Sequence, residues 1–318
     1  MTKILKLTGK ILLIALASIL ALVILFLCGM NIAKFAIYPD YYAIKTDICK
    51  NPGLYDGFVC QGVCAYEEGG KFLVTGYIKD HSASRIYVTD KENNSYYVTV
   101  TLENGKPYTG HGCGIVYKGD TAYLVSEKKI HVLSLSDILS AENGGNVTVS
   151  ETIPLNNSGS FVYSDGDYLY AGEFHNGNQY VTDHPYETPN DGTYYAIMCR
   201  YSFDDLTKPE KVYSITNQVQ GACFTPDGKI VLSTSYGLAD SYYYVYNECD
   251  AVDSGETLDG VPVYILCDPI DVVKGPAMAE GLDYYDGKVI TLTESASNKY
   301  IFGKFFFADK IVGLEFED

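Results

Sequence analysis

A unit of about fifty residues recurs along the chain after residue 56, and this repeat constrains the fold more than any other feature. Each unit opens with a polar residue and a glycine, continues as a short apolar strand, turns at Gly or Asp, and returns as a second strand that ends in small, hydroxyl or acidic residues. Five segments fit this description: QGVCAYEEGGKFLVTGY from Gln61, HGCGIVYKGDTAYLVSE from His111, SGSFVYSDGDYLYAGEF from Ser158, QGACFTPDGKIVLSTSY from Gln220 and EGLDYYDGKVITLTES from Glu280.

The spacing within the units is regular as well. Gly62, Gly159, Gly221 and Gly281 precede the ends of their second strands by 13 or 14 residues. One or two further strand-like segments follow each pair: residues 85–90 and 96–102, 130–135 and 147–153, 194–203 and 211–215, 242–247 and 261–267. Four antiparallel strands per unit describe the blade of a β-propeller. We therefore predict an all-β propeller of five four-stranded blades, or of six if an irregular unit escapes the alignment.

The last unit is one strand short. Residues 311–316 form its third strand, and the chain then ends. A segment before the repeats, Tyr41–Thr46, has the composition of a strand and would complete the blade beside residues 311–316. Such a closure removes the open sheet edges that invite aggregation.

An apolar segment precedes the repeats. Residues 11–28 read ILLIALASILALVILFLC, and residues 29–33 extend the run. A bilayer core needs about 20 such residues. Three lysines and no acid precede the run, which favours a cytoplasmic N-terminus. We predict a single-pass cell-membrane protein in contact with the lipid bilayer through residues 11–33, with its propeller domain extracytoplasmic.

The chain then divides into residues 1–34, the cytoplasmic tip and transmembrane signal anchor; residues 35–56, a linker with the ring-closing strand; and residues 57–318, the propeller. We expect residues 1–34 to form one projecting helix with few contacts to the propeller. A cleavable signal peptide is the alternative, but residues 31–36 offer poor cleavage sites. A lipoprotein acylated at Cys28 is disfavoured by the bulky Leu25-Phe26-Leu27 before it.

Eight cysteines follow the anchor, an even number that is typical of disulfides outside the cytoplasm. Several, such as Cys223 in GACF and Cys267 in YILC, lie in apolar strand patterns and resemble small buried hydrophobes. We expect mostly free thiols, with one bridge as the alternative. The chain carries 40 acidic against 23 basic residues, which disfavours nucleic acid as a partner.

The stretch QGACFTPDGKIVLSTS from Gln220 resembles the blades of YVTN, NHL and SMP-30/strictosidine-synthase-like propellers. Gly, Pro-Asp-Gly and an apolar strand recur there in this order. The resemblance covers the five repeat cores and is specific for fold rather than function. In SMP-30-like enzymes a glutamate before glycine contributes to a divalent metal site, which Glu280-Gly281 resembles. Calcium would suit such oxygen ligands. Gln220 and Ser235 replace the other expected ligands, which puts lactonase-type metal chemistry in doubt.

The register also predicts where a site would lie. First strands begin and second strands end at the same face of a propeller, around the mouth of its central channel. The polar residues at these positions form our candidate ligand site: His111, Glu127, Glu173, His175, Gln220, Tyr236, Glu280 and Glu294. The long segment 175–193 is predicted to overhang the same mouth.

Two functions follow from these residues. The first is a tethered propeller that binds a small molecule, a glycan or an extracellular protein at the channel mouth. The alternative is a lactonase-like or glycosidase-like hydrolase or lyase that uses the carboxylates, with or without calcium. Signatures of other enzyme classes, such as GxSxG, HExxH and phosphate loops, do not occur.

Overall fold

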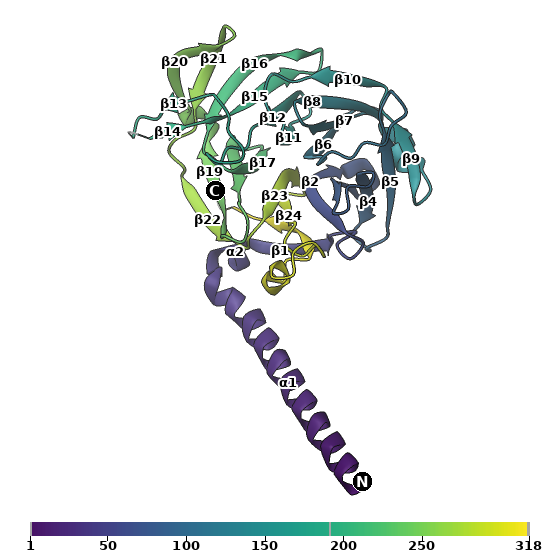
Figure 1. Ribbon diagram of the computed structural model, residues 1–318. Helices are drawn as coiled ribbons and strands as arrows, with labels where there is room; N and C mark the ends of the chain where they lie inside the picture. Colours follow the sequence, from purple (N-terminus) through teal and green to yellow (C-terminus); the bar gives the residue numbers. More distant parts are fainter. Residues whose placement is uncertain (1, 191, 317–318) are drawn as a thin grey trace.

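The computed structural model describes residues 2–190 and 192–316, and it shows a five-bladed β-propeller with a long helix at its rim (Figure 1). Helix α1 (Thr2–Ile37) leads into the short helix α2 (Pro39–Ile44), and the strands follow. Inner strand β2 packs between β6 and β23, β11 between β6 and β17, and β17 between β11 and β23. The five inner strands therefore form a closed ring, as the repeat predicts.

Four blades place their strands in chain order from the channel outward, and blade five ends with the first strand of the chain. Blade one holds β2 (Phe58–Tyr66), β3 (Lys71–Ile78), β4 (Arg85–Asp90) and β5 (Ser95–Thr101); blade two holds β6 (Gly114–Lys118), β7 (Thr121–Ser126), β8 (Lys129–Ser134) and β10 (Glu151–Pro154). Blade three holds β11 (Phe161–Ser164), β12 (Tyr168–Gly172), β15 (Ala196–Ser202) and β16 (Asp205–Ile215); blade four holds β17 (Val219–Phe224), β18 (Lys229–Thr234), β19 (Ser241–Asn247) and β22 (Asp271–Gly275). Blade five holds β23 (Ala279–Tyr285), β24 (Lys288–Thr293), β25 (Lys310–Leu314) and β1 (Lys45–Lys50).

Side chains become more exposed from the inner strands of a blade to its peripheral strands. Strand β18 is buried at every residue because neighbouring blades cover both of its faces. Such strands are apolar throughout rather than alternating. The peripheral strand β20 (Val252–Leu258) is exposed at most positions and carries polar residues. The inner hairpins turn at residues with positive φ, among them Gly166 and Gly228, where a side chain would be strained.

The ring closes through an N-terminal strand, but four residues further along the chain than the sequence predicts. Strand β1 pairs antiparallel with β25, and Lys45 lies opposite Leu314. Residues 41–44 of the predicted strand are helical instead, in α2. Pro39 at the start of α2 favours a helical turn, and the Tyr41 ring is buried beside the Tyr243 ring of blade four, with centroids 6.1 Å apart.

Two predicted fourth strands lie partly or wholly in other blades. Residues 147–153 divide between β9 (Gly145–Thr148), which extends blade one by pairing parallel with β5, and β10 of blade two. Residues 261–267 contain β21 (Val261–Ile265), which pairs parallel with β16 of blade three and antiparallel with β20. The fourth strand of blade four is therefore β22. These additions tie neighbouring blades together at the rim of the disc.

The short elements lie at turns and in loops. They are η1 (Glu67–Gly69), α3 (Leu135–Ser140), the hairpin of β13 (Tyr186–Glu187) and β14 (Thr193–Tyr194), η2 (Glu248–Asp250) and η3 (Gly303–Phe306). All nine cysteines are free thiols, and five of the eight beyond the helix are buried, in agreement with the expectation of mostly free thiols.

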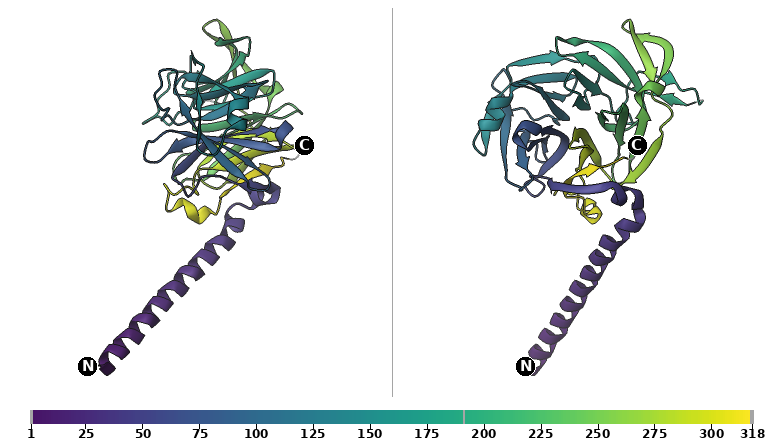
Figure 2. Two further views of the ribbon diagram at one scale, coloured as in Figure 1. Left: turned by 90° about the vertical axis from the view of Figure 1, so that its right-hand side faces the viewer. Right: turned by 180° about the vertical axis from the view of Figure 1, so that it is seen from behind.

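Helix α1 extends three residues beyond the predicted end at residue 34. Its segment Leu7–Ile37 is long and apolar enough to cross a bilayer, and none of its most apolar window is buried against the protein. The helix leaves the edge of the disc rather than its centre, as the edge-on view shows (Figure 2). It touches the propeller chiefly at η3, where the rings of Phe26 and Phe305 meet edge to face.

Candidate functional site

Three inner strands contain a β-bulge at the position that the repeat marks as polar residue plus glycine. The bulge in β2 holds Gln61, that in β17 holds Gln220, and that in β23 holds Glu280 with Gly281. A bulge inserts an extra residue that escapes the ladder, and this re-aims its side chain. The bulges thus account for three polar side chains at the mouth of the channel.

The glycines after these residues allow the inner strands to approach closely. A Cβ atom on Gly62 would lie 2.5 Å from the Cα of Gly114, and one on Gly281 would lie 2.8 Å from the Cα of Gly62. Gly221 stands in the same relation to Gly281, at 2.9 Å. The backbones of neighbouring inner strands therefore pack directly against one another at these glycines.

Glu280 and Glu294 form a carboxyl pair at this mouth. Glu280 is buried in β23, and Glu294 follows the last residue of β24. The Gln220 amide donates to Glu280 Oε1 at 3.3 Å, and the Gln61 amide donates to Glu294 Oε2 at 3.0 Å. Each carboxyl group thus receives one amide hydrogen bond from a bulge residue.

Burial shifts the titration of both carboxyl groups, and for Glu280 the charge of Glu294 adds to it. Burial, with the charge of Glu294, raises the pKa of Glu280 well above its usual range. Burial raises the pKa of Glu294 to about 7, although hydrogen bonds from Tyr300 and Gln61 and the charge of Lys299 act in the opposite direction. The pair therefore retains a proton on Glu280 at neutral pH, and Glu294 titrates close to neutrality.

Aromatic and basic side chains surround the outer carboxyl group. The Lys299 ammonium donates to the Tyr77 hydroxyl and lies over the Tyr77 ring. The His111 imidazole packs edge to face against the Tyr77 ring, with the two ring centroids 4.7 Å apart. Desolvation lowers the pKa of His111, and the nearby Glu127 carboxylate opposes this. His111 and Glu127 are exposed, so they line the rim.

Glu173 is buried in a separate arrangement of blade three. Its Oε2 lies 2.8 Å from His184 Nδ1 and accepts a hydrogen bond from the Ile197 amide at 3.3 Å. His175 is also buried, with its ring stacked on Tyr195 and its Nδ1 2.9 Å from the Thr182 hydroxyl. These two residues hold the loop after β12, and the structure does not bring them to the carboxyl pair.

The loop itself departs from the prediction that it overhangs the mouth. Its hairpin β13–β14 lies at the outer edge of the disc (Figure 1), where the Asn190 amide donates to Asp268 at 2.8 Å. Its first residues approach the channel, where Phe174 lies near the exposed Tyr236, with ring centroids 6.1 Å apart. The outward path follows from the hydrogen bonds of Glu173 and His175, which fix the start of the loop against blade three.

We expect Glu173→Gln to loosen this loop in a pH-dependent way. The hydrogen bond to Glu173 raises the pKa of His184, so its stabilising effect is complete below the unfolded value near 6.5 and is lost as pH rises through the folded pKa. In hydrogen exchange corrected for intrinsic rates, residues 175–195 should be better protected at pH 6 than at pH 8. The variant should exchange several-fold faster at pH 6 and lose the pH difference.

The exposed Glu187 in the same loop provides the control for that experiment, since Glu187→Gln removes a charge without removing a buried partner. Equal protection of the wild type at both pH values, or a Glu187→Gln effect as large as that of Glu173→Gln, would contradict the role of the pair.

The predicted calcium site at Glu280 has little support in this geometry. Among residues 2–190 and 192–316, no group of three or more His, Cys, Asp or Glu side chains is placed to hold a metal ion. Calcium takes six to eight oxygen ligands, whereas only two carboxyl groups meet here, one of them retaining its proton.

Four further residues contribute to the mouth but were not among the candidate site residues, although the segment that ends at Lys299 was expected on this side: Gln61, Tyr77, Lys299 and Tyr300. Gln61 occupies the position in its repeat that Gln220 occupies in the fourth, so the aligned Gln-Gly pairs could have revealed it. Tyr77 ends the first repeat unit at the position that Tyr236 occupies in the fourth, so the alignment could have revealed it as well. Lys299 and Tyr300 follow the last repeat unit, and only the tertiary contacts bring them in.

No protein-family model matches the sequence, and no curated protein matches it. Among solved structures, the PQQ-bound aldose sugar dehydrogenase from Streptomyces coelicolor is 15% identical over 78% of this chain and 76% of its own, with a TM-score of 0.42. A GH43_1 enzyme from Xanthomonas citri is 12% identical (78% and 83% covered, TM-score 0.43), and BamB from Moraxella catarrhalis is 8% identical (80% and 84% covered, TM-score 0.34). These similarities carry no information about ligand or reaction, and the YVTN, NHL or SMP-30-like type stays a prediction.

Proposed function

We propose that this chain is a membrane-tethered, extracytoplasmic propeller that binds a polar ligand at the mouth formed by Gln61, Gln220, Glu280 and Glu294. Residues 11–33 would anchor it, with the N-terminus in the cytoplasm. The observation that carries the proposal is the set of three bulges. Bulges place polar side chains where the ladder would otherwise be continuous, and they are over-represented beside functional sites.

The side chains at the mouth define the chemistry of the ligand. Amide, carboxyl and phenol groups donate and accept hydrogen bonds, and the rings of Tyr77, Tyr300 and His111 offer apolar faces. Hydroxyl and amine groups on a compact apolar body would match both features, as in a saccharide or an amino sugar. A protonated amine on the ligand would also pair with the Glu294 carboxylate, and its positive charge would take the place of the proton on that group.

The test is a thermal-shift screen of the full-length protein in detergent against saccharides and amino sugars. A ligand that binds the folded state raises the melting temperature according to mass action. We expect at least one compound to stabilise the wild type and to lose its effect with Glu294→Gln or Gln61→Ala. Asp165→Asn, at the opposite end of the channel, is the matched control and should retain the effect. A full panel without a shift, or shifts that survive both mouth variants, would contradict the proposal.

The carboxyl pair gives a second candidate, hydrolysis or elimination by general acid–base catalysis. A protonated Glu280 beside a Glu294 with a pKa of about 7 is the pattern in which two carboxyl groups take different roles. Product formation from any ligand found in the screen, abolished by Glu280→Gln while binding persists, would favour the enzyme. Binding without turnover would favour the binding protein.

A further inference from the structure

The segment between β24 and β25 projects from blade five on the side from which α1 departs. All three ribbon views show the η3 coil below the disc, next to the upper part of α1 (Figures 1 and 2). Ile301 and Phe302 at its tip are 73% and 65% exposed, and the Phe302 and Phe305 ring centroids lie 6.4 Å apart. This is an apolar tip with no protein surface over it among the described residues.

The contact of this tip with α1 fixes how deep the tip lies in a bilayer that surrounds the helix. The Phe305 and Phe26 ring centroids are 5.4 Å apart at an interplanar angle of 89°. Phe26 lies within the apolar run of α1, two turns before Lys34. At about 1.5 Å per residue, the Phe26 backbone lies about 12 Å from that of Lys34 along the helix axis. A bilayer that covers Phe26 therefore also covers the side chains around Phe305.

The lysines of α1 set the level of the bilayer surfaces. Lys10 and Lys34 bound the apolar run, and the 24 residue steps from one to the other correspond to about 36 Å at 1.5 Å per residue. This lies between the thickness of the hydrocarbon core, about 30 Å, and that of the bilayer with its headgroups, about 40–45 Å. Lys34 thus lies near the level of the lipid phosphates.

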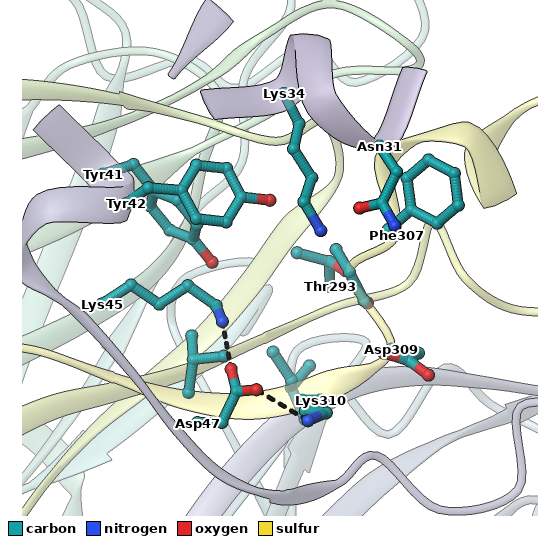
Figure 3. A pocket seen from close by; sticks show the side chains of 13 residues that line it. Asn31, Lys34, Tyr41, Tyr42, Lys45, Asp47, Thr293, Phe307, Asp309 and Lys310 are labelled. Atoms are coloured by element: carbon teal, nitrogen blue, oxygen red, sulfur yellow. Dashed lines mark hydrogen bonds and ion pairs between the residues drawn. The ribbon is translucent and has the colours of Figure 1, made fainter. Parts of the chain in front are cut away.

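A pocket of about 220 Å³ opens at this level, and the Lys34 ammonium points into it (Figure 3). The rings of Tyr42 and Phe307 stand 5.5 and 5.3 Å from the Lys34 Nζ atom. Two other lysines of the pocket, Lys45 and Lys310, are paired with Asp47, whereas Lys34 forms no ion pair within the described part of the chain. Asp309 also lines the pocket, and its carboxylate and that of Asp47 act on the charge of Lys34. Three ammonium groups thus face two carboxylates, which leaves the pocket with a net charge of +1.

The charged side chains of the projecting segment turn away from its tip. The Lys304 ammonium donates to the Ala296 carbonyl at 2.9 Å and lies over the Tyr55 ring, and Lys299 reaches Tyr77. Lysines that keep their ammonium groups away from an apolar tip are typical of segments at a membrane interface.

We infer that the tip formed by Ile301, Phe302 and Phe305 inserts into the outer leaflet beside α1, and that a lipid phosphate enters the Lys34 pocket. This inference rests on the membrane anchor of the proposed function. The propeller then stands on its rim at two points, α1 and the tip, which prevents free rotation about the tether. Lys299 and Tyr300 directly precede the inserted tip and stay at the channel mouth, beside Tyr77 and Glu294.

The chain contains no tryptophan, so a single introduced tryptophan reports its own environment. Full-length Phe302→Trp, reconstituted in phosphatidylcholine vesicles, should lose most of its emission when the acyl chains are brominated. Phe26→Trp in the anchor should behave in the same way. Tyr180→Trp, an exposed position in the loop of blade three, should be unaffected.

Quenching of Phe26→Trp without quenching of Phe302→Trp would overturn the inserted tip while leaving the anchor intact. The absence of quenching at both positions would refute the anchor and the tip together. Neither result would bear on ligand binding at the mouth.

The headgroup contact has a separate test in solid-state NMR of ¹⁵N-lysine-labelled protein in phosphatidylcholine bilayers. We expect a lysine ammonium signal that is dephased by lipid ³¹P and is missing in Lys34→Gln, while Lys106→Gln, an exposed lysine of blade one, leaves it in place. A dephased set that is identical in the wild type and Lys34→Gln would overturn the phosphate contact.

Discussion

Replacing Gly62 by alanine should destabilise the propeller by about 3 kcal/mol, the upper end of the range for overpacked interiors. The added Cβ atom would lie 2.5 Å from the Cα of Gly114 and 2.9 Å from the Thr75 hydroxyl. Backbone atoms on the neighbouring blade cannot yield without shifting the whole inner strand, and the ring of five strands transmits that shift to every blade interface.

Chemical or thermal unfolding of the full-length protein in detergent measures this loss. Gly29→Ala is the matched control, because a Cβ atom there meets no other atom within 4 Å. It should leave the unfolding transition unchanged. A Gly62→Ala protein as stable as the control would mean that the inner strands do not meet at their glycines.

The carboxyl pair should make the protein less stable as pH rises from 4.5 to about 7. Glu294 has a pKa of about 7 when folded and about 4.5 when unfolded, so the folded state binds more protons within this window. The stabilisation is complete below pH 4.5 and is lost as pH rises through the folded pKa. At about 1.4 kcal/mol per pKa unit, Glu294 alone contributes on the order of 3 kcal/mol to this loss, and Glu280 acts in the same direction.

Glu280→Gln should remove the Glu280 part of that pH dependence. Above pH 4.5 the unfolded chain loses the Glu280 proton that the folded protein keeps, whereas the amide is neutral in both states. The variant should therefore melt at a higher temperature than the wild type at pH 8 and at a similar temperature at pH 5. Glu103→Gln, at an exposed position, should follow the wild type at both pH values. Identical pH profiles for the wild type and Glu280→Gln would contradict the shifted titration.

The blade repeat was predictable because it is local. Glycine, turn and apolar strand recur at fixed spacing, and each inner hairpin forms between neighbouring segments. The exchange of β9 and β21 between blades was not predictable in the same way. In both segments buried and more exposed residues alternate, as in any outer strand. Only long-range contacts decide whether such a segment pairs with its own blade or with another.

The candidate site was likewise predictable where it follows the local repeat and not where it depends on long-range contacts. The aligned repeats identify Gln220, Glu280 and Glu294, which lie together. They also place Glu173 at an equivalent position, where His184 and the Ile197 amide instead hold it in blade three. A bulge has no signal in the sequence beyond the Gln-Gly or Glu-Gly pair, so the direction of these side chains emerges only from the strand register.

The measurement that tests the central claim most directly is the infrared spectrum of the carboxyl groups in the full-length protein at pH 7. A protonated carboxylic acid absorbs separately from a carboxylate, and exposed glutamates are ionised at this pH. We expect a protonated-carboxyl band in the wild type that persists in Glu103→Gln, weakens in Glu280→Gln and is lost when Glu280 and Glu294 are both replaced by Gln. A wild-type spectrum without this band, or a band that survives in the double variant, would contradict a proton-retaining pair at the channel mouth.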